Sequence, residues 1–245
     1  MNKEIKKAAE IIRSCHSMIA LTGAGISVES GIPDFRSSGG LWEKYDPAIY
    51  ASIESFMRNP EMVWEMLFDM TELTTNAKPN SAHVSLAQLE EKGYLKSIIT
   101  QNIDNLHQAA GSRNVIEYHG NGSRLQCMKC GESYDISGFD LSTRVPPSCE
   151  GCGSILKPAI VFFGEMIPHQ AMNESELLAR EADVVLVVGT SAIVYPAAGI
   201  PQLAKYNGAT LIEFNLEPTQ LTSYMTDVFV QGSAGVTLPA LLKQL

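Results

Sequence analysis

Two matched pairs of cysteines are the residues of this sequence whose types and spacing point most directly to chemistry. Cys127 and Cys130 form one C-x2-C pair, and Cys149 and Cys152 form a second after eighteen intervening residues. This spacing is typical of a four-cysteine zinc site, with Zn–S bonds of about 2.3 Å. Because four thiolates would close the coordination shell, we predict a structural zinc ion with no open position for substrate. A redox role for either pair is the weaker alternative, because two matched pairs explain each other.

A glycine-rich turn follows a short apolar run near the start of the chain. Residues 18–21 (Met-Ile-Ala-Leu) suit a buried strand, and residues 22–27 continue as Thr-Gly-Ala-Gly-Ile-Ser. A strand, a glycine turn and a helix N-terminus together offer free N–H groups and a positive dipole end to a phosphate. The G-x-G-x-x-G fingerprint is incomplete, because Val28 occupies the third glycine position. A nucleotide-binding turn of unusual form and an ordinary strand-to-helix turn are both open on the glycines alone.

Polar side chains follow a second apolar run. Thr100, Gln101, Asn102 and Asp104 come directly after the isoleucines at 98–99. Such side chains are costly to bury at a strand end unless each finds a partner, so we expect them to face a ligand rich in hydroxyl and amide groups. The alternative is a helix N-cap at Asn102 or Asp104, which would use only one of them.

His119 is the candidate general base. It precedes Gly120 where the cysteine-bearing segment is expected to begin, and a lone histidine is more often structural than catalytic. Its place at a predicted domain junction, in a chain with a nucleotide turn, favours catalysis. His83 and His107 lie in helical patterns, and we assign them to packing or to the surface.

Two further strand ends carry small or polar groups. Gly189, Thr190 and Ser191 follow the apolar run 184–188, and Asn215 closes the run 210–214. Each could hydrogen-bond a phosphate or a ribose. Together with the polar residues after the run at 98–99, they make three strand ends, which are better evidence for a ligand site than any one of them alone.

Composition bounds the possible functions. The chain has 245 residues, 45% hydrophobic and 18% charged, with a net charge of −9, which suits a globular protein. The acidic balance argues against a nucleic-acid footprint and is compatible with a cationic peptide partner. No apolar run approaches the length of a membrane span, and the N-terminus resembles an amphipathic helix rather than a signal peptide. Five cysteines in such a chain predict a reducing, cytoplasmic compartment.

Apolar runs alternate with helical patterns along most of the chain. The predicted strands are 18–22, 95–100, 159–163, 184–188 and 210–214, and a helix is predicted from Ser81 to Lys92. This alternation predicts an α/β fold with a parallel sheet covered on both faces and a ligand cleft at the carboxyl ends of its strands. Residues 37–79 and 121–158 break the alternation, and we interpret both as insertions that form a small lobe.

Taken in order, these motifs resemble the catalytic core of the sirtuins, a family of NAD-dependent protein-lysine deacylases. The resemblance covers roughly residues 18 to 235 and rests on residues 23–27, 31–36, 100–104, 119–120, the four cysteines, 163–165 and 189–191. It implies one core over 1–245: a Rossmann-like large domain (1–36, 80–120, 159–245) and a small domain made of a helical module (37–79) and a zinc ribbon (121–158).

The resemblance also implies roles for individual residues. NAD and an acylated lysine would meet in the cleft, with His119 acting as base on the ribose hydroxyls and Asn102 as the second catalytic residue. Contacts to NAD would come from Gly23, Ala24, Gly25, Ser27, Asp34, Phe35, Arg36, Gln101, Asn102, Ile103, Asp104, His119, Gly189, Thr190, Ser191, Asn215 and Leu216. The acyl-lysine tunnel would be lined by Val161, Phe162, Gly164, Glu165 and Val194. Products would be free lysine, nicotinamide and O-acetyl-ADP-ribose, and partners would be acetylated proteins or peptides.

Acyl preference can be predicted from the small-lobe helix. Sirtuins that prefer succinyl or malonyl lysine resemble one another in a Tyr-x-x-Arg at this helix, and to within one residue Leu67 and Met70 occupy those positions here. No Lys or Arg occurs between Arg58 and Lys78. A carboxylate entering an apolar pocket without a cation costs several kcal/mol. We therefore predict that acetyl and longer apolar chains are accepted and that succinyl and malonyl groups are disfavoured.

Two other functions are compatible with the same motifs. One is mono-ADP-ribosyl transfer, in which an acceptor side chain replaces the acyl group. The other is a non-catalytic module that binds NAD or ADP-ribose, against which the presence of both His119 and Asn102 counts.

Overall fold

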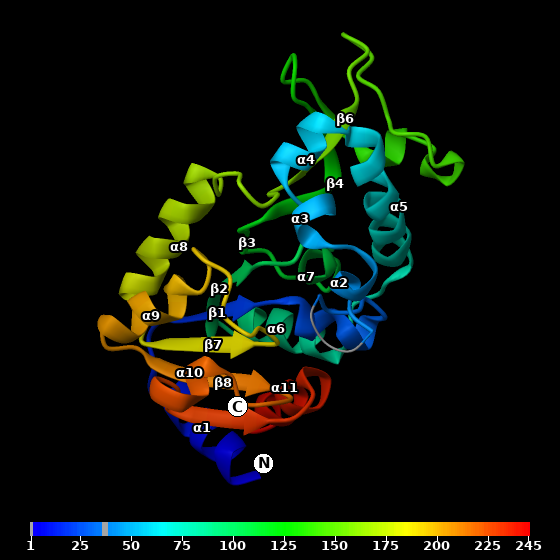
Figure 1. The fold of residues 1–245 in the computed structure, drawn as a ribbon. Coiled ribbons are helices and arrows are strands. Elements are labelled where there is room, and N and C mark those ends of the chain that lie inside the picture. The colour runs from blue at the N-terminus through cyan, green and yellow to red at the C-terminus, as the bar shows by residue number, and fades with distance from the viewer. Residues whose placement is uncertain (1, 36–38) are drawn as a thin grey trace.

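A six-stranded parallel sheet lies at the centre of the computed structural model, which describes residues 2–35 and 39–245 (Figure 1). Its strands, in spatial order, are β3 (Val115–Glu117), β2 (Leu95–Thr100), β1 (Met18–Thr22), β7 (Val184–Val188), β8 (Thr210–Asn215) and β9 (Val228–Gln231). From β1 the chain proceeds outward to β3 on one side, and from β7 it proceeds outward to β9 on the other. The strand order therefore reverses between β1 and β7, which is where ligands bind to open α/β sheets.

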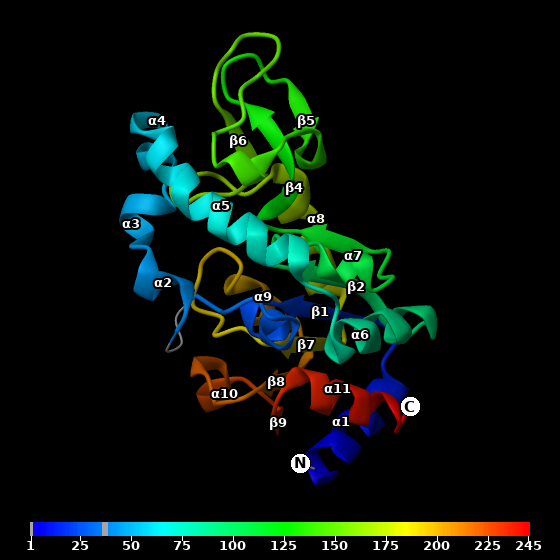
Figure 2. The same cartoon turned by 90° about the vertical axis from the view of Figure 1, so that its right-hand side faces the viewer.

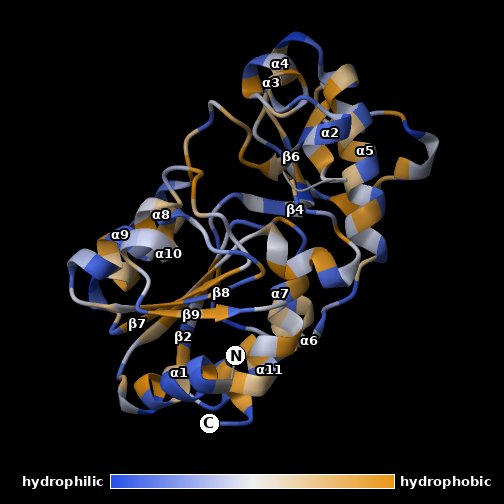
Figure 3. Cartoon of the chain, turned by 60° about the horizontal axis from the view of Figure 1, so that its bottom comes forward, coloured by the Kyte–Doolittle hydropathy of each residue, from blue (hydrophilic) through white to orange (hydrophobic). Residues whose placement is uncertain are grey.

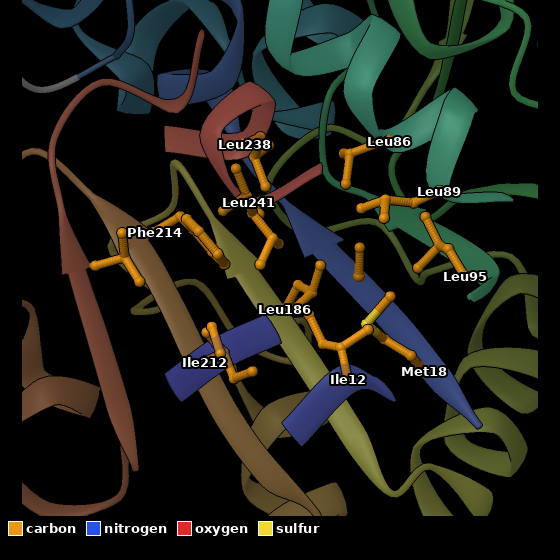
Figure 4. Close-up of a cluster of buried hydrophobic side chains, with 14 of the residues drawn as sticks. Ile12, Met18, Leu86, Leu89, Leu95, Leu186, Ile212, Phe214, Leu238 and Leu241 are labelled. Atoms are coloured by element: carbon orange, nitrogen blue, oxygen red, sulfur yellow. The ribbon is translucent and has the colours of Figure 1, made fainter. Parts of the chain in front are cut away.

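Helices cover both faces of this sheet because its central strands are apolar on both sides. Alternate side chains of β1 divide between the two faces, with Met18 and Ala20 on one and Ile19 and Leu21 on the other. The first face is covered by α1 (Asn2–Ser14), α6 (Ser81–Glu91) and α11 (Ala234–Leu242), and the second by α8 (His169–Glu181), α9 (Gly199–Tyr206) and α10 (Gln220–Tyr224). Figure 4 shows the first of these clusters, and Figure 3 shows the apolar strands between more polar helices.

A second, smaller part stands above the large sheet in Figure 1. It holds a three-stranded antiparallel sheet in the order β5 (Ser133–Asp135), β4 (Gly120–Cys127), β6 (Leu156–Ile160). Its helices, seen also in Figure 2, are α2 (Leu41–Lys44), α3 (Pro47–Tyr50), α4 (Ile53–Arg58) and α5 (Pro60–Asn76), with 3-10 turns η2 (Ile136–Gly138) and η3 (Leu141–Thr143). The buried Trp64 of α5 joins helices and sheet, because its Nε1 donates to the Leu156 carbonyl at 2.9 Å.

The predicted α/β architecture is confirmed, and two details of the prediction are wrong. The run predicted as a strand at 159–163 is β6, which ends at Ile160 and pairs antiparallel with β4 in the small sheet. Strands β3 and β9 of the large sheet were not predicted. The predicted helix from Ser81 is confirmed, with Asn80 as its N-cap and Gly93 at a φ of +79° just beyond its end. The division into domains stays a prediction.

The turn after β1 continues as a 3-10 helix, η1 (Ala24–Ser30), and a short helix, α7 (Leu106–Ala109), follows β2. Asn80 holds η1 in place, because its Nδ2 donates to the Ile26 carbonyl at 2.7 Å and to Ser30 Oγ at 3.0 Å. No helix within the described residues is both long and apolar enough to cross a membrane.

Candidate functional site

The glycine turns after β1 and β7 are in direct contact at the switch point. Gly25 N–H donates to the Gly189 carbonyl at 2.8 Å. A Cβ on Gly23 would lie 2.7 Å from Thr190 Cβ, and one on Gly25 would lie 2.7 Å from the Gly189 oxygen. These glycines are therefore required by the approach of one turn to the other, a purpose that the sequence alone did not reveal.

The polar residues after β2 form a hydrogen-bonded wall with those turns. Asn102 Nδ2 donates to Ser27 Oγ at 3.1 Å, and Ser27 Oγ donates to Asp104 Oδ2 at 2.7 Å. Gln101 Nε2 donates to Thr190 Oγ1 at 3.0 Å. Asp104 also accepts from the N–H of Leu106 at 3.0 Å, at the start of α7, but the N-cap of α7 is Asn105, so neither Asn102 nor Asp104 is the N-cap.

His119 lies beside this wall in a geometry that suits a base. Its Nδ1 is 3.1 Å from the Gln101 carbonyl oxygen, which can only accept, so Nδ1 carries the proton of the neutral ring. Nε2 then holds the lone pair, and it makes no hydrogen bond within the described part of the chain. Burial lowers the pKa of His119 below its ordinary value, although the Gln101 carbonyl opposes this. The ring is consequently neutral at pH 7 and able to take a proton.

A cavity of about 260 Å³ lies against both the wall and His119. Predicted cofactor residues that line it are Ala24, Ser27, Phe35, Gln101, Asn102, Ile103, Asp104 and His119. Every predicted tunnel residue lines it as well: Val161, Phe162, Gly164, Glu165 and Val194. The residues predicted to contact NAD and those predicted to line the acyl-lysine tunnel thus share one cavity.

The other predicted cofactor residues lie outside this cavity. Gly189, Thr190, Ser191, Asn215 and Leu216 follow β7 and β8, and Asn215 Nδ2 donates to the Thr190 carbonyl at 2.9 Å. Gly23 and Gly25 lie in the turn behind the wall, and the backbone carbonyl of Asp34 accepts from the Leu41 N–H at 3.0 Å. Arg36 lies outside the described residues.

The opposite side of the cavity is apolar and was largely missed by sequence reasoning. The lining residues also include Met70 and the unpredicted Ile32, Pro33, Trp42, Ala51, Met66, Thr74, Ile160, Phe163, Ile167, Tyr195 and Pro196. The lining residues at 66, 70 and 74 recur at one-turn spacing along α5, a signal that the sequence contained. Met70 faces the cavity as predicted, whereas Leu67 packs in the core of the small part. No Lys or Arg is among the described lining residues.

The nearest acid on α5 points elsewhere. Asp69 accepts from Tyr45 Oη at 2.6 Å, pairs with Arg144 at 2.9 Å and also pairs with Lys44. These partners, Lys44 foremost, lower the pKa of Asp69 to about 2. Both cations of this group are thereby engaged outside the cavity lining.

His83 and His107 are buried behind the polar wall. Their rings meet edge to face at 4.9 Å, and His107 Nε2 lies 2.9 Å from Thr22 Oγ1. Burial lowers the pKa of His83 to about 4 and that of His107 to about 3. Both are therefore neutral at pH 7 and pack in the interior. Of the two predicted roles, packing or surface, the structure shows packing.

The four cysteines come together in the small part. Their sulfur atoms all lie within 4.8 Å of one another, and the Cys127–Cys152 and Cys130–Cys149 Sγ distances are both 3.5 Å. A tetrahedron with Zn–S bonds of about 2.3 Å has edges of about 3.8 Å, so the cluster fits one zinc ion. The cavity lies elsewhere, and the zinc would therefore act on the fold and not on the substrate.

Comparison with known proteins decides the family. Residues 23–196 match the sequence model of the Sir2 family. The chain belongs to the Sir2 family. A relative 46% identical over 237 residues, covering 97% of this chain and 94% of its own length, is NAD-dependent protein deacylase 2 of Pyrobaculum aerophilum. The resemblance to the sirtuins is confirmed.

Solved Sir2 structures share the fold throughout. One, described as the structural basis for the mechanism and regulation of Sir2 enzymes, has a TM-score of 0.94 at 46% identity and covers 100% of this chain and 98% of its own. Another, of Sir2Af2 bound to a myristoylated histone peptide, has a TM-score of 0.86 at 40% identity, with coverage of 100% and 97%. All described cavity residues and all four cysteines lie within the Sir2 match, whereas Asn215 and Leu216 lie beyond it.

Proposed function

We propose that this Sir2 enzyme is an NAD-dependent protein-lysine deacetylase that releases nicotinamide and O-acetyl-ADP-ribose. The observation that carries the proposal is a single cavity with a hydrogen-bonded polar wall, a neutral histidine and an apolar wall. The relative from Pyrobaculum aerophilum, similar over nearly the whole chain, is an NAD-dependent deacylase, which supports the same class of reaction here.

The polar wall would hold NAD. Gln101, Asn102, Ser27 and Asp104 present amide, hydroxyl and carboxylate groups at the switch point of the sheet, and these groups match a ribose and a carboxamide. Because each side chain is already held by another, the donors and acceptors are oriented before the co-substrate arrives. The ends of β7 and β8, with Thr190 and Asn215, would extend this surface toward the adenosine.

His119 would take a proton from a ribose hydroxyl of the co-substrate. Its Nδ1 is committed to the Gln101 carbonyl, so Nε2 receives the proton and the resulting imidazolium is stabilised by that same carbonyl. The bond from the ribose to nicotinamide would break, the acyl group would pass from the lysine nitrogen to a hydroxyl of ADP-ribose, and one water from solvent would be consumed as the lysine amine is released.

The peptide would bind between two backbone segments at the rim of the cavity. The N–H groups of Gly164 and Val194 make no hydrogen bond within the described residues, and both residues line the cavity. Phe163 is already paired with the chain at Ala51 and Ile53, by hydrogen bonds of 2.9 and 3.0 Å, so the neighbouring segment is fixed. An extended peptide could add there as a strand, with its acyl-lysine directed inward.

The apolar wall favours uncharged acyl groups. Met66 and Met70 present flexible thioethers that adapt to chains of different length, and Phe162 and Ile103 complete the surface. A succinyl or malonyl carboxylate would lose its hydration without meeting a cation among the described lining residues. We therefore propose acetyl as the main acyl group, with apolar chains tolerated and acidic chains disfavoured.

The clustered thiols suit a reducing compartment. Zinc requires the four cysteines as thiolates, so we place the protein in the cytoplasm.

Incubation with NAD and an acetyl-lysine peptide, followed by mass spectrometry of all products, tests this function. We expect deacetylated peptide and O-acetyl-ADP-ribose in equal amounts. A protein or peptide made heavier by ADP-ribose would indicate mono-ADP-ribosyl transfer instead, and unchanged reactants with measurable NAD affinity would indicate a binding module. Either result would overturn the proposal.

A further inference from the structure

Lys157 is a buried lysine that the proposed chemistry does not use. It lies on β6, its side chain is only 6% exposed, and its Nζ is 2.9 Å from Glu165 Oε2. Burial lowers the pKa of Lys157, and the bond to Glu165 opposes this. Burying an ammonium group is costly unless it is paired and hydrogen-bonded, so the partners of Lys157 indicate its role.

Within the described residues, the hydrogen bonds, ion pair and ring contact of the Lys157 ammonium all involve one short segment of chain. Nζ donates to the Ile160 carbonyl at 2.6 Å and to the Pro158 carbonyl at 3.2 Å, and it lies 4.5 Å from the centre of the Phe162 ring. Its partner Glu165 accepts from the Phe162 N–H at 2.8 Å. The ammonium and this carboxylate together close residues 158–165 into a fixed loop.

Part of this segment borders two cavities. Ile160, Val161 and Glu165 line both the active-site cavity and a second cavity of about 520 Å³. Phe162 packs in the core of the small part and Phe163 is hydrogen-bonded to Ala51 and Ile53, whereas the bonds of Lys157 act on Ile160 and Glu165, at positions that border both cavities.

The fixed segment carries the parts that the proposed function needs. Val161 N–H donates to the His119 carbonyl at 2.9 Å, which ties the segment to the candidate base. Gly164, whose N–H has no partner among the described residues, lies between Phe162 and Glu165 at the rim where the peptide would bind.

We infer that Lys157 is a positioning residue for the acylated peptide: through Glu165 and the Ile160 carbonyl it holds residues 160–165 in the conformation that receives the peptide backbone. This inference rests on the proposed function. It assigns Lys157 to recognition of the peptide, while the NAD-binding wall is independent of it.

The test compares Lys157→Met, which keeps the apolar stem, with Lys157→Arg, which keeps the charge and has the second cavity to accommodate its larger head. For Lys157→Met we expect the KM for an acetyl-lysine peptide to rise at least about tenfold, because several bonds to a charged donor are lost. The KM for NAD and the affinity for ADP-ribose by calorimetry should stay within about twofold. Lys157→Arg should restore most of the peptide KM.

A matched control is Lys96→Met. Lys96 also pairs with a carboxylate, that of Glu181 at 3.1 Å, but its own side chain is 49% exposed. Lys96→Met should behave as the wild type. If Lys157→Met fails to fold, Lys157→Gln replaces it, because Gln can still donate to a carbonyl but carries no charge, and the same rise in peptide KM is expected.

An unchanged peptide KM in the folded variant would overturn the inference. So would an equal loss of peptide and ADP-ribose binding that Lys157→Arg does not restore, since that pattern indicates a general structural role. If the wild type itself gives no turnover, the proposed function fails. Fluorescence polarisation of the acetyl-lysine peptide in the presence of ADP-ribose still decides the role of Lys157, because a positioning residue must change this affinity.

Discussion

The two walls of the candidate active-site cavity are built by different means. The wall from the ends of β1, β2 and β7 is held by side-chain hydrogen bonds, such as Ser27 to Asp104 at 2.7 Å and Gln101 to Thr190 at 3.0 Å. The wall from α5 is apolar, with Met66 and Met70 packed against the small part. The first fixes directions and suits a ligand of defined polar pattern, whereas the second fixes only polarity and tolerates different shapes.

The difference follows from where each wall stands in the fold. The polar wall lies at the strand ends next to the switch point, where backbone groups and turns converge. The apolar wall comes from the helices inserted between β1 and β2, whose other side packs against the zinc-binding sheet. Loss of zinc should therefore disturb the apolar wall before it disturbs the polar wall.

Loss of the zinc ion should have the largest effect. In Cys130→Ala we expect bound zinc to fall, the small part to lose stability and deacetylation to be nearly abolished, because metal binding at such sites is largely folding free energy. Zinc content, thermal unfolding and turnover should be measured on the same preparation. Cys15→Ala, which removes a cysteine outside the cluster, is the control. Full activity without bound metal would contradict the structural role.

Removal of the base should have the next largest effect. His119→Ala should lose about 10²–10⁴-fold in kcat, the usual contribution of a positioned general base, while keeping its fold and its affinity for ADP-ribose. His169→Ala, at an exposed position at the start of α8, serves as the matched control. If ADP-ribose affinity vanished and kcat at saturating NAD stayed normal, His119 would be a binding residue.

A cation placed on the apolar wall should change acyl preference. Met70→Arg should narrow the gap between acetyl and succinyl substrates by at least about tenfold, since the new guanidinium can pair with the succinyl carboxylate. Met57→Arg, on the exposed side of α4, adds the same charge away from the cavity and should leave the ratio unchanged. A ratio that did not move in Met70→Arg would mean that the acyl chain does not reach this wall.

The pH dependence of turnover should show a small but defined effect. Because burial lowers the pKa of His119, its neutral form persists below pH 6.5, and kcat should stay level from pH 8 down to that point. Below the shifted pKa it should fall by about tenfold per pH unit as the base becomes protonated. If the pH at which kcat is half its maximum were clearly above 6.5, the pKa of His119 would not be lowered by burial, contrary to this account.

The polar wall was largely predictable from the sequence and the apolar wall was not. Thr100 to Asp104 stood out because polar residues that directly follow an apolar strand need partners. On α5, by contrast, Trp64 and Leu67 face the small core while Met66 and Met70 face the cavity, so both faces are apolar and periodicity cannot separate them.

Strand boundaries were misjudged for a related reason. The apolar run at 159–163 continues past the end of β6, because residues 161–163 leave the small sheet to line the cavity. Apolar character alone does not tell a strand from a cavity wall. Strand β3 was missed because its three residues are only half-buried and give no longer apolar run.

The central claim is that NAD reacts at the polar wall while the apolar wall selects an uncharged acyl group. The most direct test measures specificity constants for one peptide sequence that bears acetyl, butyryl or succinyl lysine, and follows nicotinamide release in parallel. We predict efficient acetyl turnover, measurable butyryl turnover and a kcat/KM for succinyl at least about 100-fold below that for acetyl, with one nicotinamide released for each lysine freed. Succinyl turnover equal to or faster than acetyl turnover, or nicotinamide release without free lysine, would contradict the account.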